Sequence, residues 1–115
     1  HRQRRVKAAL EAAWKAESGR ILAGLIRRLG DFDRAEEALH EAAARALERW
    51  PADGVPERPG AWLTRVAQRA ALDRLRRDGR AVAADDWLAA LADPAAGRDA
   101  ALDDELARFG GDDRL

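Results

Sequence analysis

The chain has 115 residues, a size that fits one small domain and excludes an elaborate multidomain enzyme. Its 21 basic and 21 acidic side chains give no net charge, which by itself argues against a uniformly basic nucleic-acid-binding protein. Cysteine is absent, so disulfides and thiolate metal sites are excluded and a cytoplasmic location is expected. No apolar run approaches the ~20 residues of a membrane span, and we expect no membrane association.

The charges are nevertheless sorted along the chain. The net charge is +6 over residues 1–30, −4 over 31–60, +4 over 61–80 and −6 over 81–115. Neighbouring segments of opposite sign predict separate acidic and basic surfaces on one small molecule.

The first predicted helix covers residues 6–29, where apolar side chains recur at intervals of four and seven. Gly30 then suits a left-handed helix cap. Gly19 and Gly24 lie inside the helix at a cost in helix propensity, and we expect them to allow the close approach of a neighbouring segment. Residues 1–5 are interpreted as a tail or tag remnant.

The second predicted helix begins near Asp33, which forms a capping box with Glu36, although Asp31 is an equally good cap. It is expected to end at Trp50 because Pro51 follows. Its packed side comprises Phe32, Leu39, Ala42, Ala43, Ala46 and Trp50. On the opposite side Glu37, Glu41 and Glu48 fall within about 40° of one another and form an acidic stripe, either solvated or bound by a basic partner.

Regular structure is excluded over residues 51–60, which contain three prolines and two glycines and should form a stiff loop. A third helix is predicted from Gly60 to Asp78, ending at Gly79. Its packed side comprises Leu63, Val66, Ala67 and Ala70, while Arg65, Arg69 and Arg76 share another stripe about 40° wide. Such an arginine row is a solvated face by default, but it also suits phosphate binding.

The predicted fold class is therefore all-α. We expect a compact three-helix bundle over residues 6–79, followed by an acidic linker over 80–115 with short helical pieces at 85–92 and 99–109.

Catalytic residue types are scarce, and we expect no enzyme. Ser18 and Thr64 are the only residues of their kinds and His40 is the only internal histidine, so no nucleophile–base pair is apparent. Glu37-x-x-His40 has the spacing of a di-iron helical site, but such a site needs that motif twice. No metal and no cofactor are therefore expected.

Two segments carry a family resemblance, one running from Gly30-Asp-Phe-Asp-Arg-Ala-Glu-Glu-Ala-Leu-His40 to Trp50-Pro51 and the other from Pro59-Gly-Ala-Trp-Leu-Thr-Arg65 to Arg77. Over about residues 8–80 the chain resembles region two of bacterial sigma factors of the extracytoplasmic-function (ECF) group. The stretch Ala46-Leu-Glu-Arg-Trp-Pro-Ala-Asp-Gly-Val-Pro56 is most similar to a subgroup with a helical-repeat extension. Asp112-Asp-Arg-Leu115 is similar to the segment that leads toward a second, region-four domain.

The resemblance implies a promoter-recognition domain that binds core RNA polymerase and the minus-ten element and helps DNA melting in transcription initiation. It implies docking on the coiled coil of the largest polymerase subunit through Asp33, Glu36, Glu37, His40 and Glu41. It implies capture of a flipped base by Asp53, Gly54, Val55, Glu57 and Arg58. Contacts to the non-template strand are implied for Trp62, Arg65, Gln68, Arg69 and Arg76, with burial in the core an equal alternative for Trp62.

The alternative is a sigma-like protein-docking module without DNA binding. The stiff loop and the arginine row distinguish the two interpretations, because a pure docking module need not keep them. An anti-sigma protein or the chain's own acidic tail is a further expected partner, as an inhibitor. The sequence departs from the family at position 40, usually Gln, and at position 43, usually a bulky aromatic residue, where it has His40 and Ala43.

Overall fold

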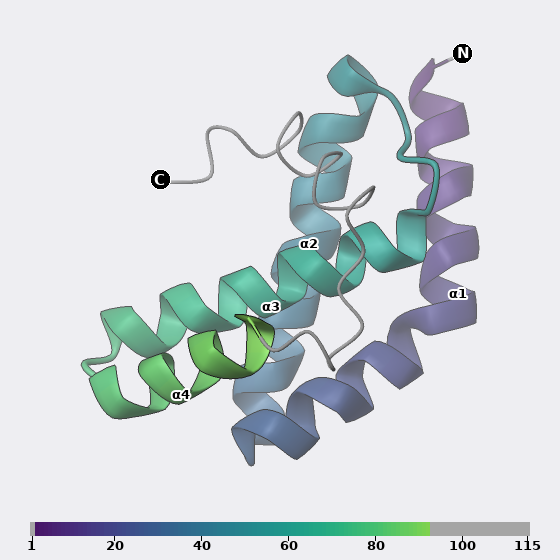
Figure 1. Cartoon of the computed structure of the whole chain (residues 1–115). Helices are drawn as coiled ribbons and strands as arrows, with labels where there is room; N and C mark the ends of the chain where they lie inside the picture. The colour runs from purple at the N-terminus through teal and green to yellow at the C-terminus, as the bar shows by residue number, and fades with distance from the viewer. Residues whose placement is uncertain (1, 93–115) are drawn as a thin grey trace.

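The computed structural model describes residues 2–92, which form four helices and no strand (Figure 1). The helices are α1 (Arg2–Leu29), α2 (Phe32–Asp53), α3 (Pro59–Arg77) and α4 (Ala81–Ala92). Helices α1 and α3 pack on α2, and α4 lies alongside α3 (Figure 1). The all-α fold class is confirmed, while the helical piece predicted at 99–109 lies outside the described residues.

Helix α1 begins earlier than predicted. The guanidinium of Arg2 donates a hydrogen bond of 2.9 Å to the backbone carbonyl of Pro51, at the far end of α2. Residues 2–5 are therefore part of the helix and not a tail. The predicted left-handed cap is confirmed at Gly30, whose φ is 68°.

The two glycines inside α1 do not face a close neighbour, so that prediction was wrong. A Cβ at Gly19 would meet nothing within 4 Å, and one at Gly24 would meet only the Arg27 side chain at 3.8 Å. The close approach occurs instead at Gly60, where a Cβ would collide with the Glu17 carboxylate of α1. The contact is with the far end of a flexible side chain, so Glu17 could move to admit a Cβ, and the start of α3 lies against the Glu17 side chain of α1.

Helix α1 changes direction along its length (Figure 1), and its sequence contains Ser18 followed by Gly19. Serine and glycine pairs are common sites of helix bending. Val6 and Leu10 before this pair and Ile21 and Leu25 after it are all buried. The bend therefore keeps both halves of α1 on the core.

Helix α2 is the centre of the bundle because its packed side is made of small residues. Four of its alanines have no exposed surface, namely Ala35, Ala38, Ala42 and Ala46. Small side chains allow α1 and α3 to approach the α2 backbone on both sides. Trp50 fills the end of the core and meets Trp62 of α3 edge-to-face, with ring centroids 5.3 Å apart. Phe32 was wrongly predicted to pack: it is the first residue of α2 and is 51% exposed.

The N-terminal cap of α2 is Asp31, one of the two predicted alternatives. Its carboxylate accepts a hydrogen bond of 3.2 Å from the backbone N–H of Arg34, whereas Asp33 lies inside the first turn.

Pro51 does not end α2, contrary to the prediction. The helix continues through Asp53 and ends at Gly54, whose φ is 96° and whose N–H donates to the Trp50 carbonyl at 2.8 Å. A proline removes one helical hydrogen bond, and close to a helix end the remaining bonds are enough to complete the last turn. The connecting loop is therefore shorter than predicted.

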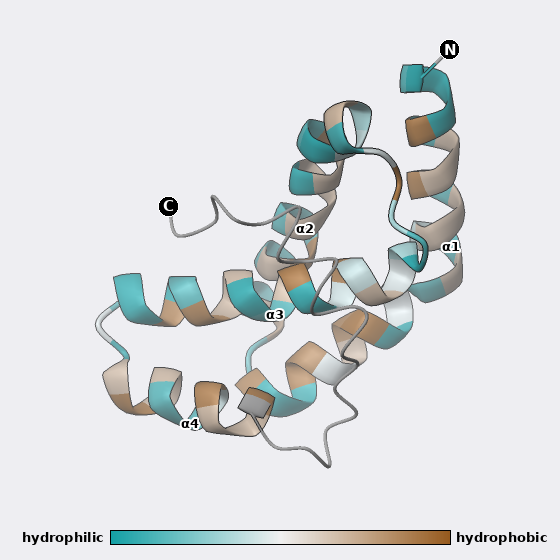
Figure 2. Ribbon diagram, turned by 45° about the horizontal axis from the view of Figure 1, so that its top comes forward, coloured by the Kyte–Doolittle hydropathy of each residue, from teal (hydrophilic) through white to brown (hydrophobic). Residues whose placement is uncertain are grey.

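Helix α3 runs from Pro59 to Arg77, one residue earlier at each end than predicted, and Gly79 follows its C-cap residue Asp78 at a φ of 74°. Helix α4 begins four residues before the predicted piece at 85–92 and is largely hydrophobic (Figure 2). Its Ala84 and Trp87 belong to the buried core. The packed unit thus extends beyond the predicted boundary at residue 79. None of the described helices is long and apolar enough to cross a membrane.

Candidate functional site

The loop between α2 and α3 presents its side chains to solvent while its backbone is anchored. Pro56 in the loop and Gly60 at the start of α3 are buried, and they fix the loop against the bundle. The residues predicted to hold a flipped base are all exposed: Asp53, Gly54, Val55, Glu57 and Arg58. Proline restricts φ, so these side chains are displayed on a loop that loses little conformational freedom on binding.

The basic side of α3 is only partly open to solvent. Arg69 and Arg76 are exposed, and Arg65 and Gln68 are half-buried. The backbone carbonyl of Gln68 accepts a hydrogen bond of 2.8 Å from the indole N–H of Trp87, so α4 borders this side of α3. The surface available to a strand is therefore centred on Arg69 and Arg76.

Trp62 was one of the predicted strand contacts, and the structure places it in the core. Only 2% of its surface is exposed, and its ring lies edge-to-face with Trp50. An indole buried to this extent cannot stack on a base without leaving the core. We therefore assign Trp62 to packing, which corrects its prediction as a strand contact.

The five predicted polymerase-facing residues of α2 differ in how far they are exposed. Asp33, Glu37 and His40 are exposed, whereas Glu36 and Glu41 are half-buried. The ring of His40 lies 5.4 Å from the ring of Trp14 on α1. Glu37 and Glu41 instead lie beside α3, so the helix presents different members of the set to its two neighbours. Among residues 2–92, no three His, Asp or Glu side chains are grouped so as to hold a metal ion.

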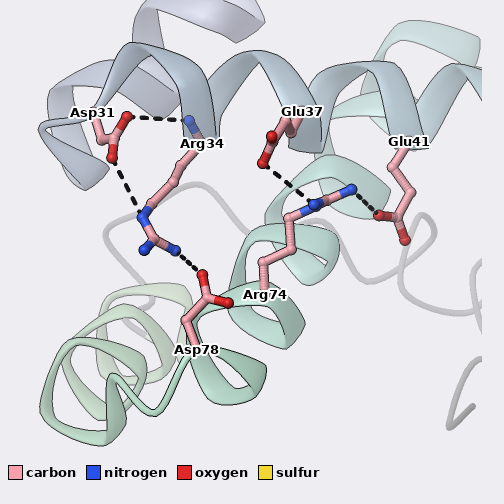
Figure 3. Close-up of polar contacts among 6 residues, drawn as sticks. All are labelled: Asp31, Arg34, Glu37, Glu41, Arg74 and Asp78. Atoms are coloured by element: carbon pink, nitrogen blue, oxygen red, sulfur yellow. Dashed lines mark hydrogen bonds and ion pairs between the residues drawn. The ribbon is translucent and has the colours of Figure 1, made fainter.

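Arg74 of α3 pairs with the predicted acidic stripe (Figure 3). Its guanidinium contacts Glu41 at 3.0 Å and Glu37 at 3.3 Å. Glu41 also contacts Arg45 of its own helix at 3.1 Å. The stripe is therefore partly neutralised from within the molecule and is not a purely solvated face.

A second ionic contact joins α2 to the end of α3 (Figure 3). The Arg34 guanidinium pairs with Asp78 and lies 3.3 Å from the Asp31 carboxylate. The hydrogen bond to Asp78 and the charges of both carboxylates raise the pKa of Arg34 above its already high value. Asp31 thus caps α2 and also orients the arginine that reaches α3.

These contacts change which acidic groups remain for a partner. Asp33, Glu36 and Glu48 of α2 make no ion pair with another residue of the described part of the chain. Sequence reasoning missed Arg34 and Arg74, although the opposite net charges of segments 31–60 and 61–80 are the signal that would have paired them.

Fold and surface define a small helical module with an exposed, anchored loop, a basic side on α3 and an acidic side on α2. The chain belongs to the Sigma-70 region 2 family, whose family model matches residues 13–81. Region two of sigma-70 factors takes part in promoter recognition, within factors that bind core RNA polymerase and promoter DNA.

One similar protein comes from Rhizobium meliloti (strain 1021) and bears the name "Uncharacterized protein R00370". It is 42% identical over 62 residues, which are 54% of this chain and 15% of that protein. The chain thus corresponds to a small part of this relative. No solved structure matches the chain.

Proposed function

We propose that this chain is the region-two domain of a sigma factor of the ECF group, which recognises the minus-ten element and helps to open it. In this proposal the loop at residues 53–58 captures a flipped base, and the Arg69 and Arg76 side of α3 follows the non-template strand. The acidic side of α2 docks on the coiled coil of the largest subunit of core RNA polymerase.

The anchored loop is the observation that carries the proposal. Its five candidate base-pocket residues are exposed at the end of α2 and in the loop, on both sides of the buried Pro56. Selecting one extruded base needs a preformed pocket, because a flexible loop would lose binding free energy on ordering. The family match supports the same role, since the matched region includes α2, the loop and α3.

DNA binding is tested by fluorescence anisotropy with a single-stranded non-template minus-ten oligonucleotide. The double variant Arg69→Ala plus Arg76→Ala should bind the oligonucleotide about tenfold more weakly. The slope of log affinity against log salt concentration should become shallower by about 0.7 for each phosphate contact that is lost. Lys15→Ala plus Arg27→Ala, which removes the same charge from exposed positions of α1, is the matched control. An equal loss of oligonucleotide affinity in both double variants would show that only the net charge matters, and it would refute the assignment of DNA binding to α3.

Polymerase docking is tested with the acidic residues that make no internal ion pair. Asp33→Arg plus Glu36→Arg should weaken the recovery of core polymerase in a pull-down. Glu11→Arg plus Asp85→Arg, which makes the same charge change at exposed positions of α1 and α4, is the control. Circular dichroism of each variant confirms that α2 still forms. Normal recovery with the double variant would place the docking surface elsewhere.

The alternative, a protein-docking module without DNA binding, predicts a different combination of results in these two assays. It would retain core polymerase in the pull-down but show no salt-dependent binding of the oligonucleotide. An inhibitory acidic tail would raise the oligonucleotide affinity when the chain is shortened, and chains ending at residues 80 and 92 should be compared with the full 115 residues. Of the acidic tail predicted at 81–115, residues 93–115 lie outside the described part of the chain.

A further inference from the structure

A cavity of about 470 Å³ lies where the ends of α1 and α3, the start of α2 and the inner side of α4 meet. This volume is within the range of about 300–1,000 Å³ that is typical of small-molecule sites. None of the residues assigned above to DNA or polymerase lines it. The cavity is therefore a separate feature of the molecule.

Three arginines line this cavity, namely Arg28, Arg34 and Arg80. Arg34 is held by Asp31 and Asp78 and is already neutralised. Arg28 and Arg80 are exposed, and within residues 2–92 neither is paired with a carboxylate. The cavity thus offers two guanidinium groups for an anion, with donors in the planar fork that matches phosphate.

The remaining wall is mainly apolar. Leu29, Leu75, Ala83, Ala90 and Trp87 contribute to it. The Trp87 indole is fixed by its hydrogen bond to the Gln68 carbonyl, and the Arg28 guanidinium lies over its ring at 5.9 Å from the centroid. Because only 4% of Trp87 is exposed, a ligand would reach this wall mainly through Leu29, Ala83 and Ala90. An apolar wall beside guanidinium groups that no carboxylate pairs suits a ligand with an apolar body and an anionic group.

Asp86 is the other acidic residue of the lining besides the Asp31 cap, and it is exposed. Its carboxylate would repel a phosphate and accept a hydrogen bond from an amino or hydroxyl group. The anionic part of a ligand must therefore lie toward Arg28 and Arg80, with a hydrogen-bond donor toward Asp86.

We propose that the cavity binds a nucleoside phosphate. The phosphate lies at Arg28 and Arg80, the base rests against the apolar wall, and a base amino group or a ribose hydroxyl donates to Asp86. Such a ligand would contact both α1 and α4 and would fasten α4 to the bundle. The proposal does not depend on the sigma-factor function.

The test is isothermal titration calorimetry of the 115-residue chain with ADP, adenosine and inorganic phosphate, together with thermal melts. ADP should bind saturably, raise the melting temperature, and bind at least about tenfold more tightly than adenosine or phosphate, because only ADP uses both parts of the cavity. Arg28→Ala and Arg80→Ala should each weaken ADP binding by about tenfold or more. Arg27→Ala and Arg77→Ala, which are neighbouring exposed arginines outside the lining, should change it by less than about twofold.

Several results would overturn the proposal. Failure of ADP to bind saturably would remove the site, and equal affinity for ADP and inorganic phosphate would show that no base is recognised. Unchanged binding by both Arg28→Ala and Arg80→Ala would place any nucleotide elsewhere. Loss of ADP binding in the Arg69→Ala plus Arg76→Ala variant alone would assign the nucleotide to the DNA-binding side of α3.

Discussion

Replacement of Arg74 by alanine should lower the free energy of unfolding by about 1–2 kcal/mol. The contact with Glu41 joins side chains that are 30% and 23% exposed at 3.0 Å, and we assign it about 1 kcal/mol, the upper end for exposed pairs. The contact with Glu37, whose side chain is 58% exposed, should contribute about 0.3 kcal/mol. Glu41 keeps Arg45 at 3.1 Å, so its carboxylate is not left alone and the loss is limited.

The assay is a double-mutant cycle of Arg74→Ala and Glu41→Gln, with urea unfolding followed by far-UV circular dichroism. We expect a coupling energy of about 1 kcal/mol, which should fall at 1 M salt because the Debye length there is only about 3 Å. Arg77→Ala, an exposed arginine of the same helix, should change stability by less than about 0.5 kcal/mol. A coupling below about 0.3 kcal/mol, or an equal loss in Arg77→Ala, would refute the pairing of α2 with α3 through Arg74.

Three further predictions concern the core and the helix ends. Trp62→Ala should lower the free energy of unfolding in urea by about 3–5 kcal/mol, because the side chain is buried. A stability near that of the parent would show that Trp62 is not a core residue. Asp31→Ala should cost about 1 kcal/mol and Asp33→Ala only a few tenths, and the reverse order would make Asp33 the cap. A chain ending at residue 80 should be about 2–3 kcal/mol less stable than one ending at residue 92, because it lacks the buried Trp87; equal melting temperatures would show that α4 is dispensable.

Prediction of the first three helices succeeded because local patterns specify them. Apolar periodicity marked the buried sides of α1 and α3, and the glycines at 30 and 79 have the positive φ that ends each helix. Prediction failed at Pro51 because a proline is tolerated in a last turn, and a sequence pattern does not show which turn is last. Helix α4 was placed in a linker because the acidic composition of residues 81–115 hid its short apolar pattern.

The candidate site was predicted in part. The loop residues are exposed as a base-binding role requires, since no regular structure can cover a segment rich in proline and glycine. The acidic residues of α2 were read as one surface, but the crossing of α3 over α2 brings Arg74 to Glu37 and Glu41. Helical spacing tells which side chains share a face of one helix, and it says nothing about the charges on the helix that packs beside it.

The sequence by itself determined the all-α class, the sorting of charge and the position of the stiff loop, because propensity, periodicity and the φ restrictions of proline and glycine act over a few residues. The tertiary structure alone decided that Trp62 is core, that Arg34 and Arg74 join α2 to α3, and that α4 closes a cavity lined by Arg28 and Arg80. These features depend on how helices distant in the chain cross and pack, and such contacts are set by the shape and chemistry of the whole core.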